Sequence, residues 1–204
     1  MTTVHLVDDE AVVRDALAFL LGSRGLSVQT YDSGPALLDA LAYQREQMRR
    51  PVRGVFVLDV RMPQMSGLQL HEALIGLGLR NPVLFLSGHG DIPMVVEALK
   101  KGAFDFLEKP YSDNTLAERI EQALAVEAAS VADNAAALER QARLASLSER
   151  EREVMQRVAA GKLNKVIADE LHIAVRTVEV HRARVFAKLG VKSAAELAGW
   201  LAVA

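Results

Sequence analysis

The first 110 residues alternate between short apolar runs and segments with helical periodicity, and this alternation constrains the fold more than any other feature. The helical segments carry apolar residues at the spacing of an amphipathic helix, as Val13, Leu17 and Leu20 do. The runs between them are mostly apolar, which is typical of buried parallel strands. Strands are therefore predicted at residues 4–7, 26–31, 55–58, 83–86 and 103–107. The alternation predicts an α/β domain with a five-stranded parallel sheet and helices on both faces.

A second region, rich in helix formers, follows this domain. Residues 123–145 contain mostly Ala, Glu, Arg and Gln and no Gly or Pro, so a helical linker is predicted. Ser148 and Glu151 have the spacing of a capping box, which opens an all-α domain. Its helices are expected at residues 149–160, 164–171, 175–189 and 193–203. The predicted domains are thus 1–122, a linker at 123–146, and 147–204.

Composition excludes several classes of protein. The 204 residues are 50% hydrophobic and 25% charged, as in a globular chain of about two domains. There is no cysteine, so disulfides, thiolate metal sites and cysteine nucleophiles are excluded. The N-terminus does not resemble a signal peptide, and no apolar run has the roughly 18 residues of a membrane span. We expect a soluble, cytoplasmic protein.

The charge is distributed unevenly. Residues 1–122 contain 12 Lys/Arg and 16 Asp/Glu, whereas residues 155–192 contain 8 and 3. A basic segment next to an acidic domain indicates a nucleic-acid partner. A solvated basic face is the alternative.

Polar residues follow four of the predicted strands. In a parallel sheet these carboxyl ends meet at one edge, where ligands bind. Carboxylates that face one another repel, and a hard divalent cation with oxygen ligands relieves the repulsion, for which Mg²⁺ fits best. The residues at this edge are Asp8, Asp9, Glu10, Asp59, Ser87 and Lys109. Ser87 and Lys109 could bind the oxygens of a phosphoryl group on a carboxylate, although solvated acids in loops are the alternative.

Two related chemistries fit less well. A flavin-phosphate loop after the first strand would place phosphate beside Asp8, Asp9 and Glu10, which repel it. A haloacid-dehalogenase-type phosphatase requires a second Asp two residues after the nucleophile, where Arg61 stands. The five histidines lack metal-ligand spacing, so none is assigned to a metal.

The segments VDDE, LDVRMPQMSG, LSGHGD and DFLEKP occur in this order and resemble the motifs of the bacterial response-regulator receiver domain. The resemblance implies a flavodoxin-like fold and a sensor histidine kinase as partner. Asp59 would be the phosphoacceptor. Asp8, Asp9 and Asp59, with the backbone carbonyl of Arg61, would hold Mg²⁺.

The same resemblance implies how the signal is read. Ser87 and Lys109 would bind the phosphoryl oxygens, and the peptide bond before Pro110 would be cis. Phe106 would be the switch aromatic, with a role in the core as the alternative. The stretch GHGDIPMVVEALKKGAFDF resembles the FixJ subgroup, which implies a dimer surface on residues 91–101 and the fifth strand.

Residues 147–197 resemble the LuxR/NarL-type helix-turn-helix. This implies a scaffold helix at residues 165–171 and a recognition helix at 175–189 that enters the major groove of double-stranded DNA. Arg176, Glu179, Val180 and Ala183 are then candidates for contact with base edges. Candidates for phosphate contact are Lys165, Thr177, His181, Arg184 and Lys188. A helical packing module with solvated basic residues is the alternative.

Two positions depart from the helix-turn-helix pattern. Ala174 and Val175 replace the usual Ser or Thr cap with a following Pro, and His172 stands where Gly is common. Each is expected to weaken a helix cap by about 1 kcal/mol. Outside the family motifs, Arg45, Arg49, Arg50 and Arg53 cluster before the third strand. We interpret them as a helix end and solvated loop, with kinase docking or an interdomain patch as the alternative.

Together these patterns predict a phosphorylation-controlled transcriptional regulator rather than an enzyme. It would dimerise on phosphorylation, bind DNA and act on RNA polymerase. A phosphorylation-independent DNA-binding protein, whose receiver serves only for dimerisation, is the alternative.

Overall fold

The computed structural model describes residues 2–48, 51–88 and 92–202. The chain divides into two compact units, Met1–Ser130 and Val131–Ala204. The division lies inside the predicted linker, so each unit contains part of it. None of the helices in the described ranges combines the length and the apolar character that a membrane span requires.

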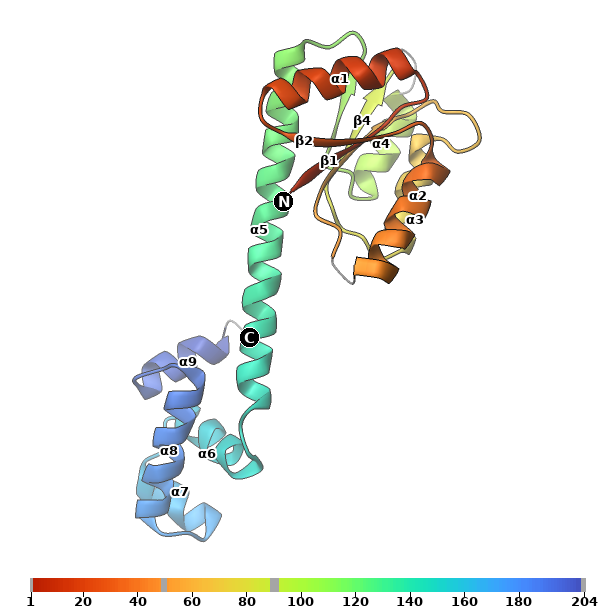
Figure 1. The fold of residues 1–204 in the computed structure, drawn as a ribbon. Helices are drawn as coiled ribbons and strands as arrows, with labels where there is room; N and C mark the ends of the chain where they lie inside the picture. Colours follow the sequence, from red (N-terminus) through yellow and green to blue (C-terminus); the bar gives the residue numbers. More distant parts are fainter. Residues whose placement is uncertain (1, 49–50, 89–91, 203–204) are drawn as a thin grey trace. The chain divides into compact units, whose positions relative to one another are not determined.

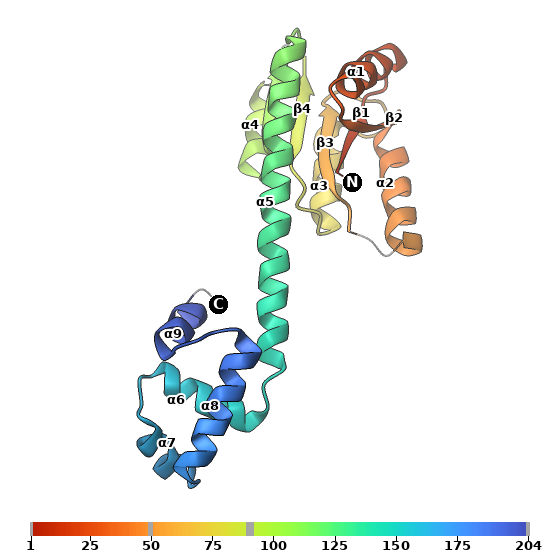
Figure 2. The same cartoon turned by 60° about the vertical axis from the view of Figure 1, so that its left-hand side comes forward.

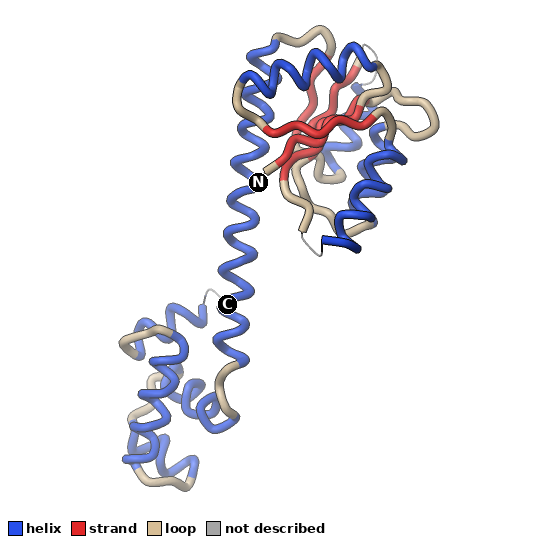
Figure 3. The backbone as a smooth tube through the Cα atoms, viewed as in Figure 1, coloured by secondary structure: helices blue, strands red, loops and turns tan. Residues whose placement is uncertain are grey.

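The first unit contains a parallel sheet of five strands in the order β2-β1-β3-β4-β5 (Figures 1 and 3). The strands are β1 (Thr3–Val7), β2 (Ser27–Tyr31), β3 (Gly54–Asp59), β4 (Val83–Ser87) and β5 (Asp105–Glu108). The central strand β3 is buried along its whole length, in agreement with its apolar sequence. The predicted α/β sheet is therefore confirmed.

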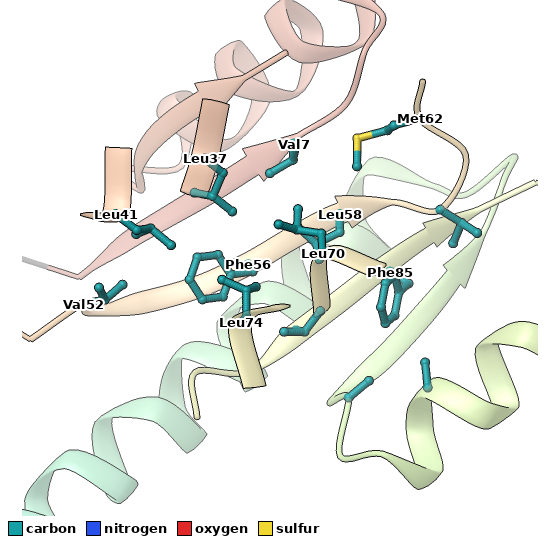
Figure 4. Close-up of a cluster of buried hydrophobic side chains, with 14 residues drawn as sticks. Val7, Leu37, Leu41, Val52, Phe56, Leu58, Met62, Leu70, Leu74 and Phe85 are labelled. Atoms are coloured by element: carbon teal, nitrogen blue, oxygen red, sulfur yellow. The ribbon is translucent and has the colours of Figure 1, made fainter. Parts of the chain in front are cut away.

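Helices cover both faces of this sheet. On one face α2 (Gly34–Tyr43), α3 (Gly67–Gly76) and α4 (Ile92–Lys100) pack against β1, β3 and β4, and Figure 4 shows the cluster of buried side chains around Phe56 and Phe85. On the other face α1 (Ala11–Ser23) contributes Leu17 and Leu21 to a second cluster. The start of α5 contributes Leu116 and Ile120. Apolar side chains thus hold the strands rigidly, and the polar groups are left at the strand ends.

The strand order brings four polar strand ends to one edge of the sheet. β3 ends at Asp59 and β4 at Ser87, while Asp8 and Lys109 directly follow β1 and β5. The segment after β3 is tightly packed, because a Cβ on Gly67 would lie 2.2 Å from the carbonyl oxygen of Asp59. This close approach fixes the backbone around Asp59.

The helix α5 (Asp113–Ala145) is continuous over 33 residues and includes the division between the two units (Figure 2). It contains nearly all of the predicted linker 123–146. The stripe of α5 that faces the sheet is apolar as far as Ala123 and ends at Glu127, which is also buried. The rest of α5 is mostly exposed, and its alanine content supports a helix without a tertiary cover.

The second unit is all-α, as predicted. After the end of α5 it contains α6 (Glu149–Ala159), α7 (Asn164–Leu171), α8 (Val175–Leu189) and α9 (Ala194–Ala202). The capping box of Ser148 and Glu151 is formed at the start of α6. Val178, Val185 and Leu189 of α8 are buried in a core to which all four helices contribute.

Both expected weak caps occur at the turn between α7 and α8. His172 ends α7 in the left-handed conformation, with φ 52°, which a residue with a Cβ adopts at a cost. Ala174 is the N-cap of α8 and supplies no side-chain hydrogen bond. Its extended backbone, with φ −68° and ψ 145°, is nevertheless suited to a capping hydroxyl.

We expect Ala174→Ser to stabilise the second unit by about 1 kcal/mol, because the new hydroxyl would accept a hydrogen bond from a backbone N–H in the first turn of α8 that has no partner within the helix. For a unit of this size, that gain raises Tm by about 4–8 °C. The fluorescence of Trp200, the only tryptophan, reports on this unit because Trp200 packs against its core. Ala187→Ser, an exposed position within α8, is the control and should not raise Tm. An equal Tm for Ala174→Ser and the wild type would contradict the cap.

Candidate functional site

The ammonium group of Lys109 joins two buried carboxylates at the polar edge of the sheet. Its Nζ lies 2.6 Å from Oδ1 of Asp59 and 3.4 Å from Oδ2 of Asp8. Asp8 is 1% exposed and Asp59 7%, so both carboxylates are largely removed from water. The three side chains that the sequence placed at different strand ends therefore meet in space.

Backbone and side-chain donors orient the two carboxylates. The amide of Glu10 donates to Oδ1 of Asp8 at 2.9 Å, and the amide of Arg61 donates to Oδ2 of Asp59 at 2.8 Å. Arg14, on the first turns of α1, donates from Nη1 to the carbonyl oxygen of Asp8 at 2.7 Å. The role of Arg14 was not predictable from the sequence, because a hydrogen bond to a backbone carbonyl leaves no sequence pattern.

Burial and the ion pair act on the site in opposite directions. Burial raises the pKa of Asp59 above its ordinary value, although the hydrogen bond and charge of Lys109 act to lower it. Burial also acts to lower the pKa of Lys109, but the hydrogen bonds and charges of Asp59 and Asp8 raise it overall. Lys109 thus remains a cation, and Asp59 is less stabilised as an anion than a solvated carboxylate.

Ser87 places an unused hydroxyl in the interior at this edge. Ser87 is fully buried, and its Oγ has no hydrogen-bond partner among the described residues. A buried hydroxyl without a partner costs about 1–3 kcal/mol, so the position is suited to a ligand oxygen that arrives later. The peptide bond between Lys109 and Pro110 is cis, as expected.

Phe106 lies on β5, three residues before Lys109. It is half-buried and packs against the core cluster of α2, α3 and α4, opposite Phe85 on β4. This position is compatible with both roles that the sequence left open. The predicted dimer surface begins at Asp91, which lies outside the described residues.

The donor set fits a hard cation. Asp8 and Asp59 supply carboxylate oxygens at one point, and Asp9, on the adjoining loop, is exposed. Among the described residues, no group of three His, Cys, Asp or Glu side chains is arranged to hold a metal. Lys109 is bound to both buried carboxylates, so Asp9 and the Arg61 carbonyl would be needed to complete an oxygen site.

The surface of α8 separates as predicted into a buried and an exposed side. Arg176, Glu179, Val180 and Ala183 are all exposed, opposite the buried stripe. Arg176 and Glu179 form an exposed ion pair at 3.1 Å. The four candidates for base contact are therefore exposed, and two of them pair with each other at the surface.

The basic side chains of residues 155–192 fall into two groups. Five of the eight have an acceptor inside the unit, and they are Arg157, Lys162, Arg176, Arg182 and Lys188. The side chains of Lys165, Arg184 and Lys192 have no ion pair or hydrogen bond in the described part of the chain. Thr177 is likewise exposed. Lys165 and Arg184 are thus available for phosphate.

Two of the predicted phosphate residues are placed differently. Lys188 donates to the carbonyl oxygen of Ser146 at 2.9 Å and to Oε2 of the buried Glu151 at 2.7 Å. It therefore ties the end of α8 to the start of α6, and its charge is used within the unit. His181 is half-buried, and its Nδ1 is buried without a hydrogen-bond partner among the described residues.

Two arginines of the cluster before β3 make contacts within the first unit. Arg45 donates to the carbonyl oxygen of Leu77 at 3.2 Å, at the end of α3. Arg53 binds the carboxylate of Glu127 on α5. Arg49 and Arg50 lie outside the described residues. A π-helical turn, Gln44–Met48, continues α2, in agreement with the predicted helix end. The predicted solvated loop is not what the structure shows for Arg53, because its side chain pairs with a buried carboxylate.

Comparisons with known proteins cover both units. The family "Response regulator receiver domain" matches residues 4–121, and "Bacterial regulatory proteins, luxR family" matches residues 145–201. The chain is 48% identical over 191 residues to the transcriptional regulatory protein FixJ of Rhizobium meliloti, covering 94% of this chain and 90% of that protein. It is 47% identical over 198 residues to the C4-dicarboxylate transport transcriptional regulatory protein DctR of Rhodobacter capsulatus, covering 96% of this chain and 97% of that protein.

Two solved structures of response regulators match nearly the whole of this chain. The response regulator StyR, at 40% identity, matches with a TM-score of 0.89 over 100% of this chain and 99% of that chain. Full-length FixJ of B. japonicum, at 42% identity, matches with a TM-score of 0.60 over 98% and 95%. With its receiver unit and its LuxR-type helix-turn-helix unit, the chain belongs to the NarL/FixJ family of two-component response regulators.

Proposed function

We propose that this protein is a phosphorylation-controlled transcriptional regulator that accepts a phosphoryl group on Asp59 from a sensor histidine kinase. The observation that carries the proposal is the ion pair of 2.6 Å between Lys109 and Asp59, beside the unpartnered, buried hydroxyl of Ser87. The acceptor carboxylate, a cation and a free hydroxyl donor thus occur together. The names of FixJ and DctR, both transcriptional regulators, support the output.

In the proposed transfer, an oxygen of the Asp59 carboxylate attacks the phosphorus of a phosphohistidine on the kinase. The new P–O bond forms as the P–N bond breaks, and the leaving imidazole keeps the electron pair. Lys109 stays protonated because its pKa is raised, so it can donate to a phosphoryl oxygen. The partly desolvated Asp59 is a better nucleophile than a solvated carboxylate.

The oxygens of Asp8, Asp9 and Asp59, with the Arg61 carbonyl, would hold Mg²⁺. When bound, the ion supplies positive charge that offsets the repulsion between carboxylates and phosphoryl oxygens. The chain's own part is to orient these oxygens, which the amides of Glu10 and Arg61 do. Ser87 would donate its hydroxyl to a phosphoryl oxygen, and the neighbouring Phe106 would follow into the space that opens.

Asp59→Asn should abolish acid-labile labelling by acetyl phosphate in the presence of magnesium, because the amide is not a nucleophile and the other carboxylates are held for the cation. Asp39→Asn, an exposed carboxylate on α2, is the matched control and should label as the wild type does. Labelling is followed with acetyl phosphate that carries a radioactive phosphoryl group. If Asp59→Asn were labelled as strongly as the control, the acceptor would be another residue.

The second unit is proposed to bind double-stranded DNA through α8. Arg176, Glu179, Val180 and Ala183 would meet base edges in the major groove. Lys165, Arg184, Thr177 and His181 would contact phosphates, whereas Lys188 is occupied by Glu151 and is not included. Binding to the chromosome would place the protein in the cytoplasm, and contact with RNA polymerase would follow from DNA binding.

Lys165→Ala and Glu179→Ala should affect DNA binding differently. Loss of the free Lys165 cation should weaken binding to all sequences and lower the log-log salt slope by about 0.9. Glu179→Ala should instead change the preference at particular base pairs, as measured by competition among operator variants. Lys162→Ala is the control, since Lys162 is already paired with Glu170 and should change the slope less. The same uniform loss for Lys165→Ala and Glu179→Ala would contradict the orientation of α8.

A phosphorylation-dependent dimer would couple the two units, because a single helix-turn-helix buries little surface on DNA. Phosphorylation should stabilise the dimer by about 1–3 kcal/mol, or about 5- to 150-fold in affinity. Sedimentation of the full chain with and without beryllofluoride, a mimic of the phosphoryl group, measures this gain. Asp59→Asn should not respond. A dimer of equal affinity in both states would favour the phosphorylation-independent alternative.

A further inference from the structure

A buried carboxylate lies where the linker helix leaves the receiver. The residues of α5 that are buried against the sheet are Leu116, Ala117, Ile120, Ala123 and Glu127, of which the first four are apolar. Glu127 takes the last position of this stripe and is only 3% exposed. It lies three residues before Ser130, the last residue of the receiver unit. A carboxylate is rarely buried in this way without a dedicated partner.

The partner is the start of β3. Nε and Nη2 of Arg53 donate to the two oxygens of Glu127 at 2.5 and 3.2 Å, and the backbone amide of Gly54 donates to Oε1 at 3.3 Å. A bidentate arginine and a backbone amide together fix both the position and the rotation of the carboxylate. We call these three groups, Arg53, Gly54 and Glu127, the latch.

The corner of the receiver that carries the latch is rigid. Gly54 has φ +121°, and a Cβ there would lie 1.7 Å from the carbonyl oxygen of Thr3, so the backbone is pressed against β1. Asn81 donates to the carbonyl oxygens of Val52 and Gly54 at 3.2 and 2.9 Å. The latch therefore holds α5 to a part of the chain that has little freedom to move.

The latch is accessible on one side only. The Arg53 side chain remains 36% exposed and borders a cavity of about 640 Å³ that is also lined by His5, Tyr31 and Tyr43. Glu127 has no such access to water. Loss of the arginine contact would therefore leave a buried charge, which favours release of the helix from the receiver.

We propose that this latch fixes the point at which the linker helix leaves the receiver, and that transmission of the Asp59 signal to the DNA-binding unit depends on it. The proposal rests on the proposed function, because it concerns how a signal from Asp59 would reach the second unit, and α5 is the segment of the chain that joins the two units. Leu116, Ile120 and Ala123 hold α5 only as far as its third turn. Without the latch, the helical turn between Ala123 and Ser130 would not be held to the receiver. A conformational change in the receiver would then not move the rest of α5.

The variant Glu127→Gln tests the latch, because it keeps the size of the side chain but removes the charge and one acceptor. Glu121→Gln, exposed on the same helix, is the matched control. Because the chain has no cysteine, nitroxide labels can be attached at Ser23→Cys and Ser130→Cys, two exposed positions in the receiver unit. Electron paramagnetic resonance then gives the distribution of the distance between the labels in the full chain.

We expect Glu127→Gln to broaden this distance distribution and to lower the ratio of DNA affinities with and without beryllofluoride by about 5-fold or more. Labelling of Asp59 by acetyl phosphate should stay within about twofold of the wild type, since the latch lies at the opposite end of β3. Glu121→Gln should match the wild type in all three measurements. If Glu127→Gln fails to fold, Arg53→Lys, which keeps the charge but not the bidentate contact, should show the same broadening and a smaller ratio.

An unchanged distance distribution in the latch variant would overturn the proposal. So would a broadened distribution with an undiminished affinity ratio, because the pair would then have only a structural role. A wild-type chain that is labelled by acetyl phosphate but whose DNA affinity does not respond to beryllofluoride would contradict both the proposed function and the transmission role. A wild type that responds, together with a variant that responds equally, would contradict the latch alone.

Discussion

The bond between Lys109 and the two carboxylates of Asp8 and Asp59 is the interaction on which the receiver depends. Parallel strands bring these residues to one edge of the sheet, where two buried carboxylates without a cation would repel each other strongly. The 2.6 Å contact with Asp59 and the 3.4 Å contact with Asp8 offset this repulsion. The same ammonium group that offsets this repulsion would bind a phosphoryl oxygen in the proposed transfer.

The helix-turn-helix unit uses charge in two separate ways. Lys188 and Arg182 bind acceptors inside the unit, at Glu151 and Asn164, and so hold its helices together. Lys165 and Arg184 have no such acceptor in the described part of the chain and remain exposed. A cation that already has a carboxylate partner gains less from a DNA phosphate than one that is free. Sequence alone cannot separate these groups, because all four residues are basic and lie within one segment.

Much of the fold was predictable because it depends on local patterns. The apolar runs identified the strands, and the Ser148–Glu151 spacing identified the start of α6. The charged residues at the strand ends likewise predicted that Asp8, Asp59 and Lys109 lie close together, because the carboxyl ends of parallel strands meet at one edge of the sheet. The pair of Arg53 and Glu127 was not predictable, because the two residues are separated by 74 positions and neither has a recognisable motif. Such a contact depends on where α5 packs, which only the assembled sheet determines.

The costs of folding in the receiver are concentrated at its two polar ends. The interior between them is mostly apolar, as the fully buried β3 shows. At one end Ser87 has a buried hydroxyl without a partner, and burial raises the pKa of Asp59. At the other end Glu127 is buried and depends on Arg53 and Gly54. Apolar residues at these positions would remove those costs, but an apolar side chain could not serve as the proposed phosphoacceptor, and it would lack the two directed hydrogen bonds by which Arg53 fixes the rotation of the Glu127 carboxylate. In the proposed mechanism, a rigid and mostly apolar sheet with polar groups at both ends would connect phosphorylation of Asp59 to the helix that leaves at Glu127.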